Sequence, residues 1–254
     1  MRALRPDRLR ARPPAARPPR MNPLPNDEEA RVLLRKIVEG QAYRQLMLCN
    51  IRGHGIKFLP ELEDKIAYAE RLALSLRQFR EIQRLYAELC GGDVISAVRS
   101  RMERIPYPSS RMELAVCLFL CMRAERAALS AYVDSSATGF AAIARTRLEI
   151  PPPGDLPRDA AFVEFCGDAS NRPHAQQMVN RWLAICLVSL GRPDSPGDAR
   201  AVALGLRTRH VADIVLEFLG GLAGFLEACA LVLPDAATLG IELPSGLGAA
   251  ARRS

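Results

Sequence analysis

The chain has 254 residues, enough to bury a full hydrophobic core, and 49% of them are hydrophobic. The formal net charge is +7, but residues 1–20 hold seven Arg and one Asp, which leaves only +1 for the rest of the chain. Ala, Leu and Arg are abundant while β-branched and aromatic residues are few, a composition that favours helices over strands.

Residues 1–25 are rich in Pro and Arg and lack apolar periodicity, so we expect a disordered basic tail. This tail has no apolar region of the kind that a secretory signal requires. A nucleic-acid-binding or membrane-binding arm, a targeting peptide, and an extension before a true start at Met21 are alternative interpretations. Because the positive charge is confined to the tail, we expect neither a membrane nor nucleic acid as a partner of the folded part.

Three helices are predicted before the middle of the chain. Asn26 is a candidate N-cap with acidic residues after it, and Gly53 and Gly55 are candidate stop signals for the first helix. Pro60 marks the first turn of the second helix, and Gly91 follows its end. The apolar spacing places these helices at residues 26–50, 60–90 and 94–105.

The segment 110–133 is predicted to be the central helix. Ser110 and Glu113 have the spacing of a capping box, and the run from Leu114 to Met122 is apolar on every helical face. Such a helix is buried on all sides, yet the run is far shorter than the roughly 20 residues of a membrane span. We therefore expect the core helix of a bundle.

Further helical patterns follow over residues 134–149, 158–166, 173–191 and 199–234. The sequence contains neither a segment of useful length with strand periodicity nor an internal repeat. The predicted fold is all-α: an antiparallel helical bundle over residues 26–235 with additional C-terminal helices, followed by a flexible tail over residues 236–254.

Seven cysteines form no CxxC pair, and Cys117 and Cys121 lie among apolar residues of the central helix. We expect most of the thiols to be buried as small hydrophobic groups. An odd number of cysteines without a secretion signal indicates a reducing, cytoplasmic location.

A di-iron centre is the chemistry to test in such a bundle, since it requires a Glu from each of two helices and a Glu-x-x-His from each of two others. The sequence contains no Glu-x-x-His. Its histidines, His54, His174 and His210, are each interpreted as surface or capping residues. Both of the usual imidazole ligands are therefore missing.

The segment NRWLAICLVSLGRPDSPGDARAVALGLRTR and the later ALVLPDAATLGIELP resemble the C-terminal part of the phenylacetic acid catabolic proteins. This family comprises the ferritin-like oxygenase subunits of phenylacetyl-CoA epoxidase. The resemblance includes an Arg-Trp early in a helix, a Gly-x-Pro-Asp-Ser-Pro turn and a late Leu-Pro-Asp. The second ligand helix of that family corresponds in its position along the chain to the segment DKIAYAERLALSLRQF. The resemblance as a whole covers about residues 30–240.

The resemblance implies a ferritin-like fold in which the family's metal ligands are replaced. The alignment that the resemblance implies places Ser75 and Gln78 at the Glu and His of one Glu-x-x-His motif, and Met122 near an acidic ligand. It places Glu149 at the remaining Glu of the last such motif, with Pro152 where the His would stand. Other acidic positions on the predicted bundle helices are interpreted as surface or cap residues, with some kept as metal candidates. They are Glu39, Glu70, Glu113 and Glu125.

Two functions follow from these observations. The first is a non-catalytic scaffold or partner bundle, in a homo- or hetero-oligomer with helical subunits, that needs no cofactor. The alternative is a divergent di-iron or other carboxylate-metal monooxygenase acting on an aromatic or acyl-CoA-type substrate, with Glu39, Glu70, Glu125 and Glu149 as candidate ligands. The sequence leaves open whether the protein is an enzyme and favours the view that it is not.

Overall fold

The computed structural model describes residues 25, 27–149 and 157–241, and every regular element among them is helical. The all-α prediction is therefore confirmed. The expected tails at residues 1–25 and 236–254 lie largely outside the described residues. The α-helices are α1 (Glu28–Gly55), α2 (Leu62–Cys90), α3 (Val94–Met102), α4 (Arg111–Ser130), α5 (Thr138–Glu149), α6 (Pro157–Gly167), α7 (Arg172–Leu190), α8 (Pro196–Ala203), α9 (Val211–Gly220), α10 (Ala223–Ala228) and α11 (Ala236–Leu239).

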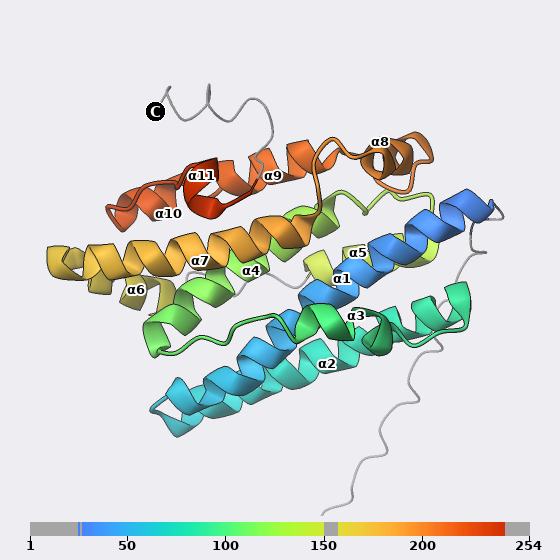
Figure 1. Ribbon diagram of the computed structural model, residues 1–254. Coiled ribbons are helices and arrows are strands. Elements are labelled where there is room, and N and C mark those ends of the chain that lie inside the picture. The colour runs from blue at the N-terminus through green and yellow to red at the C-terminus, as the bar shows by residue number, and fades with distance from the viewer. Residues whose placement is uncertain (1–24, 26, 150–156, 242–254) are drawn as a thin grey trace, which may run out of the picture.

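Four of these helices form a closed ring of neighbours. α1 contacts α2 and α4, and α5 contacts the same two helices from the other side. α1 and α2 lie antiparallel along most of their lengths (Figure 1). The side chains that point into this ring therefore come from four helices that are distant in sequence.

The remaining helices form a layer on the other side of α4. α7 packs along α4, and α6 and α9 also contact α4, while α11 packs on α7 (Figure 1). α4 thus lies between the ring and the outer layer, and residues on all of its faces are buried. This confirms the prediction of an apolar central helix, and it explains why the sequence there lacks a polar face.

The start of α4 differs slightly from the predicted capping box. The Ser110 hydroxyl accepts a hydrogen bond from the Glu113 backbone N–H at 3.1 Å, as expected. The Glu113 carboxylate, however, accepts from the backbone N–H and hydroxyl of Ser109, both at 2.7 Å, and not from Ser110. The side chains of Ser110 and Glu113 thus each cap a backbone N–H, but the Glu113 side chain caps Ser109, one residue before the predicted Ser110.

The N-cap of α1 differs from the predicted one, and the helix ends within the predicted glycine stop. Asp27 is the N-cap, with its side chain accepting from the Glu29 N–H at 3.1 Å, whereas Asn26 lies outside the described residues. The helix also continues through Gly53 and ends at Gly55. Gly55 is helical, with a φ of −73°, so the helix ends there without a left-handed glycine cap. A Cβ on Gly55 would lie 2.6 Å from a methyl carbon of Leu114, so this glycine permits close packing on α4.

The single helix predicted over residues 199–234 is also wrong, because the chain there forms α8, a turn, α9 and α10. The break is held by the buried carboxylate of Asp198. It accepts hydrogen bonds from the backbone N–H of Val211 at 3.1 Å and from the guanidinium of Arg207. Gly205 turns the chain with a φ of 66°, a value that disfavours other residues.

Six of the seven cysteines are buried, as expected for thiols used as small hydrophobic groups, and Cys90 is exposed. None of the described helices combines the length and the apolar character that crossing a membrane would require.

Candidate functional site

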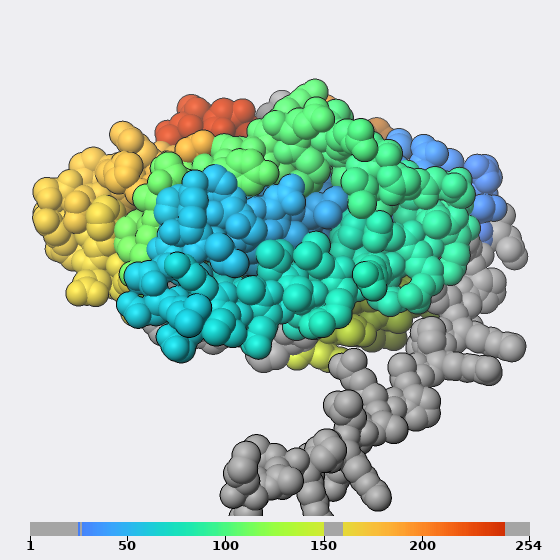
Figure 2. Space-filling view, turned by 90° about the horizontal axis from the view of Figure 1, so that it is seen from below, coloured from blue at the N-terminus to red at the C-terminus, as the bar shows by residue number. Residues whose placement is uncertain are grey.

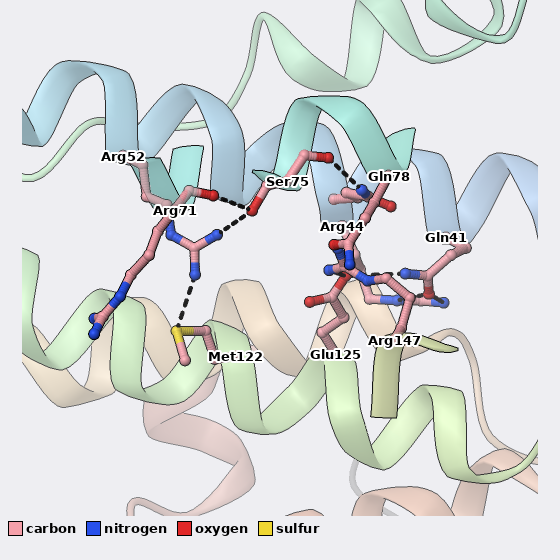
Figure 3. Close-up of polar contacts among 10 residues, drawn as sticks. Gln41, Arg44, Arg52, Arg71, Ser75, Gln78, Met122, Glu125 and Arg147 are labelled. Atoms are coloured by element: carbon pink, nitrogen blue, oxygen red, sulfur yellow. Dashed lines mark hydrogen bonds and ion pairs between the residues drawn. The ribbon is translucent and has the colours of Figure 1, made fainter. Parts of the chain in front are cut away.

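The interior of the four-helix ring contains a polar network where an ordinary bundle has only apolar side chains (Figure 3). All four helices contribute to it. Its members are Gln41, Arg44, Gln45 and Arg52 on α1, Ser75 and Gln78 on α2, Met122 and Glu125 on α4, and Arg147 on α5.

Glu125 is the centre of this network and its one carboxylate. One oxygen, Oε1, accepts a hydrogen bond from the Gln41 amide at 3.0 Å and from Arg147 Nη2 at 2.6 Å. The Glu125 and Arg147 side chains are only 7% and 10% exposed, so their ion pair is largely withdrawn from water. Arg147 also donates to Gln78 Oε1. A single ion pair and its two amides thus connect α1, α2, α4 and α5.

Arg44 extends the network towards the outer layer. Its guanidinium donates to Gln41 Oε1 at 2.9 Å and to the backbone carbonyl of Ser189 on α7 at 2.7 Å. Burial disfavours the charged form and lowers the pKa of Arg44, and the negative potential of Tyr132 and Glu125 opposes this effect. Arg44 therefore joins the four-helix ring to α7 through backbone and amide acceptors.

Arg52 closes the other end of the network. It donates to the Ser75 hydroxyl at 2.7 Å and to the sulfur of Met122 at 3.3 Å, and Ser75 in turn donates to the carbonyl of Arg71 at 2.9 Å (Figure 3). The Gln45 amide donates to the Ser75 carbonyl at 2.8 Å. Burial also lowers the pKa of Arg52, with nearby Glu125 acting in the opposite direction.

The residues present in this interior do not fit a di-iron centre. Two iron ions need several carboxylates and two imidazoles, whereas the network offers one carboxylate, which Arg147 already neutralises. The guanidinium groups of Arg44, Arg52 and Arg147 give the region a net positive charge, which repels a cation. Nowhere in the described part of the chain do three or more His, Cys, Asp or Glu side chains gather in a way that could hold a metal ion.

Four of the residues singled out from the sequence come together here. Ser75, Gln78 and Met122, the positions assigned to lost ligands, all take part in the network, and so does Glu125. Glu125 was expected at the surface or at a cap, and this expectation is wrong because its residue is only 5% exposed.

The other acidic candidates lie elsewhere. Glu149 is exposed at the end of α5. The side chain that points into the ring is that of Arg147, two residues earlier on the same helix. Glu70 is exposed on α2, and Glu39 accepts a hydrogen bond from the hydroxyl of Tyr86 at 2.7 Å, outside the network. Pro152 lies outside the described residues. The carboxylates proposed as alternative metal ligands therefore do not converge.

Glu113 forms a separate buried contact between α4 and α7. Besides Ser109, it accepts hydrogen bonds from Arg181 at 2.9 Å and from the indole N–H of Trp182 at 3.0 Å. Burial alone would raise the pKa of Glu113, but the hydrogen bonds from Ser109 and Trp182 and the charge of Arg181 hold it below its ordinary value. Its role is to anchor the start of α4.

The histidines take no part in the network. His54 stacks on Tyr107 with ring centroids 4.6 Å apart, and both line an open pocket of about 540 Å³ on the outer side of α1 and α2. His174 is exposed, and His210 lies at the N-terminus of α9 with its Nδ1 atom 3.3 Å from Asp198. No imidazole faces the interior of the ring among the described residues.

Sequence reasoning missed the residues that complete the network, Gln41, Gln45, Arg44, Arg52 and Arg147. A signal was present for α1, since Gln41, Arg44 and Gln45 interrupt its apolar stripe at spacings of three and four and share one helical face. Nothing in the local pattern around Arg147 distinguishes it from the exposed Arg145.

No protein-family model matches the chain, and no curated protein is similar to it in sequence at a significant level.

Proposed function

We propose that this protein is a ferritin-like bundle, related to the subunits of phenylacetyl-CoA epoxidase, that acts as a non-catalytic scaffold or partner subunit. The observation that carries the proposal is the chemistry inside the four-helix ring. Where such oxygenases need carboxylates and imidazoles, this chain has an Arg–Glu ion pair with amide and hydroxyl partners.

The network supplies a physical reason why the bundle needs no metal. In a di-iron protein, the ions neutralise carboxylates from four helices and so hold the helices together. Here the Arg147 guanidinium neutralises Glu125, while Gln41 donates a hydrogen bond to Glu125 and Gln78 accepts one from Arg147. The same four helices are connected by side chains of the protein alone.

The alternative of a carboxylate-metal monooxygenase receives no support from the geometry. Its candidate ligands Glu39, Glu70 and Glu149 lie apart from Glu125. A partner role is consistent with a helical bundle in which the described residues of the interior do not include the set of ligands that an oxygenase needs to activate dioxygen.

The test begins with metal binding. The purified full chain is loaded anaerobically with Fe(II), desalted and measured by elemental analysis, beside the variants Glu125→Gln and Glu149→Gln. We expect the same background iron in all three proteins. About two irons per wild-type chain, lost in Glu125→Gln but kept in Glu149→Gln, would overturn the proposal in favour of the monooxygenase.

The partner role is tested separately by titrating the chain with a catalytic, iron-loaded subunit of a phenylacetyl-CoA epoxidase and measuring the mass of the product by light scattering. We expect a stable complex of defined stoichiometry. If the two proteins elute separately at all ratios, the partner role is wrong, whatever the iron content.

A further inference from the structure

Helix α2 carries a stripe of exposed apolar side chains along its N-terminal half. Leu62 is 64% exposed, Ile66 is 50% exposed and Leu76 is 46% exposed, and Ala69 and Ala73 lie exposed between them. Single exposed apolar residues are ordinary, but a continuous row of them on one helix indicates a surface that binds another molecule.

The spacing of this stripe indicates what kind of structure covers it. Leu62, Ile66, Ala69, Ala73 and Leu76 are separated by four, three, four and three residues. This is the 3.5-residue period of a coiled-coil seam, in which the side chains of one helix insert between those of another. The stripe therefore fits a helix, and it fits an extended peptide or a small molecule less well.

The stripe is separate from the face of α2 that packs within the protein. Tyr68, Ser75, Phe79 and Ile82 are buried on the opposite side, towards α1 and the interior of the ring. The space-filling view from below shows α2 crossing the molecular surface without another described helix over it (Figure 2). A partner could thus bind the stripe without disturbing Ser75 or Gln78.

The charges beside the stripe indicate which helix it binds. The N-terminal end of the stripe is flanked by Glu61, Glu63, Asp64 and Lys65, a net charge of −2, and the C-terminal end by Arg77, Arg80, Glu81 and Arg84, a net charge of +2. Two copies of α2 side by side in parallel would place like charges together. In an antiparallel pair, the acidic end of each copy meets the basic end of the other.

We propose that α2 is a self-association surface on which a second copy of this chain binds in an antiparallel arrangement about a two-fold axis. A surface that is complementary to itself when reversed is what a two-fold symmetric interface requires. This inference rests on the surface of α2 alone and is independent of the function proposed above.

One register aligns the two apolar stripes and places Arg80 of one copy near Glu63 of the other. Ile66 packs against Leu76 of the second copy, and Ala69 packs against Ala73 of the second copy. The alanines allow the two helices to approach closely at the centre, while the larger residues fill the space on either side. The aliphatic part of Arg80 then covers Leu62 of the second copy, and its guanidinium lies beside Glu63 of that copy.

The experiment is sedimentation velocity on the full chain over a range of concentrations up to about 200 µM, since an interface of one helix pair is small. We expect a monomer–dimer equilibrium. Ile66→Glu should weaken dimerisation at least tenfold, because it places a carboxylate in the seam. Val188→Glu is the matched control: Val188 is 62% exposed on α7, and the same change there should leave the dimer intact.

A charge exchange tests the antiparallel arrangement and does not depend on inserting a charge into the seam. Arg80→Glu should weaken the dimer, and Glu63→Arg combined with Arg80→Glu should restore it, because the two sites face each other across the axis. A chain that stays monomeric at all concentrations, or a dimer that is insensitive to Ile66→Glu, would overturn the proposal. Binding of only a different helical protein to this face would overturn it as well.

Discussion

At the scale of single residues, the polar network inside the bundle depends on the hydrogen-bond donors of one carboxylate, Glu125. Both donors to Glu125 Oε1, Gln41 and Arg147, come from other helices. A buried carboxylate that loses its cation keeps the cost of desolvation without the compensating attraction, so the two members of the pair cannot be removed independently.

Replacing Arg147 with Met should therefore lower the free energy of unfolding by about 3–5 kcal/mol, because Glu125 is left buried without its hydrogen-bonded cation. The double variant Arg147→Met with Glu125→Leu should recover a large part of the loss. Urea denaturation followed by circular dichroism measures both changes. Arg84→Met, which removes an exposed ion pair with Glu81, is the control and should cost less than about 1 kcal/mol. Equal losses at the two sites would show that the interior pair is not desolvated.

Two glycines of α1 that look alike in the sequence should respond in opposite ways to substitution by alanine. Gly53→Ala should stabilise the protein by up to about 1 kcal/mol, since alanine favours the helix and the nearest atom would be 3.9 Å away. Gly55→Ala should destabilise it by about 1–3 kcal/mol, because the new methyl group would lie 2.6 Å from Leu114. Thermal and urea unfolding of the two variants give the comparison. A stabilised Gly55→Ala would mean that α1 and α4 do not approach this closely.

At the scale of helices, the start of α4 is fixed to α7 by the ionised form of Glu113. Because the pKa of Glu113 is lower in the folded chain than its ordinary value of 4.5, the resulting stability is fully present above pH 4.5. It is lost as the pH falls through the lower pKa of the folded protein. Glu113→Gln removes this ionisation but keeps a similar shape.

We expect the free energy of unfolding of the wild type to fall more steeply below pH 4.5 than that of Glu113→Gln. Urea titrations at neutral pH and at several acidic values test this difference. Glu70→Gln, at an exposed position of α2, should follow the wild type. Parallel curves for the wild type and Glu113→Gln would rule out the ionised anchor between α4 and α7.

Helix boundaries also show what could be read from the sequence and what could not. The end of α2 was predictable because Gly91 adopts a φ of 67°, a local conformation that glycine favours. The end of α1 at Gly55 also falls within the predicted glycine stop, but the close contact of Gly55 with Leu114 on another helix could not be predicted from the local sequence. The break between α8 and α9 likewise depends on Asp198 binding the backbone of Val211, a contact that no periodicity reveals.

At the scale of the whole molecule, the sequence predicted the all-α class, the order of the long helices and the burial of α4. It also selected Ser75, Gln78, Met122 and Glu125, four residues that the fold brings into one network. It did not predict the arginines of this network, because the choice of Arg147 over Glu149 depends on the direction in which the last turn of α5 faces the ring.

The ion pair at the centre of the ring has a consequence for the evolution of such a bundle. Arg147→Glu alone would remove the cation that is hydrogen-bonded to Glu125 and place a second carboxylate beside it, so that two like charges repel each other. Glu125→His alone would leave Arg147 buried without its anion. Both of these single substitutions give a less stable protein, so a metal-binding interior would require several substitutions on different helices together. Selection for a stable fold therefore opposes the gain of a metal site at this position.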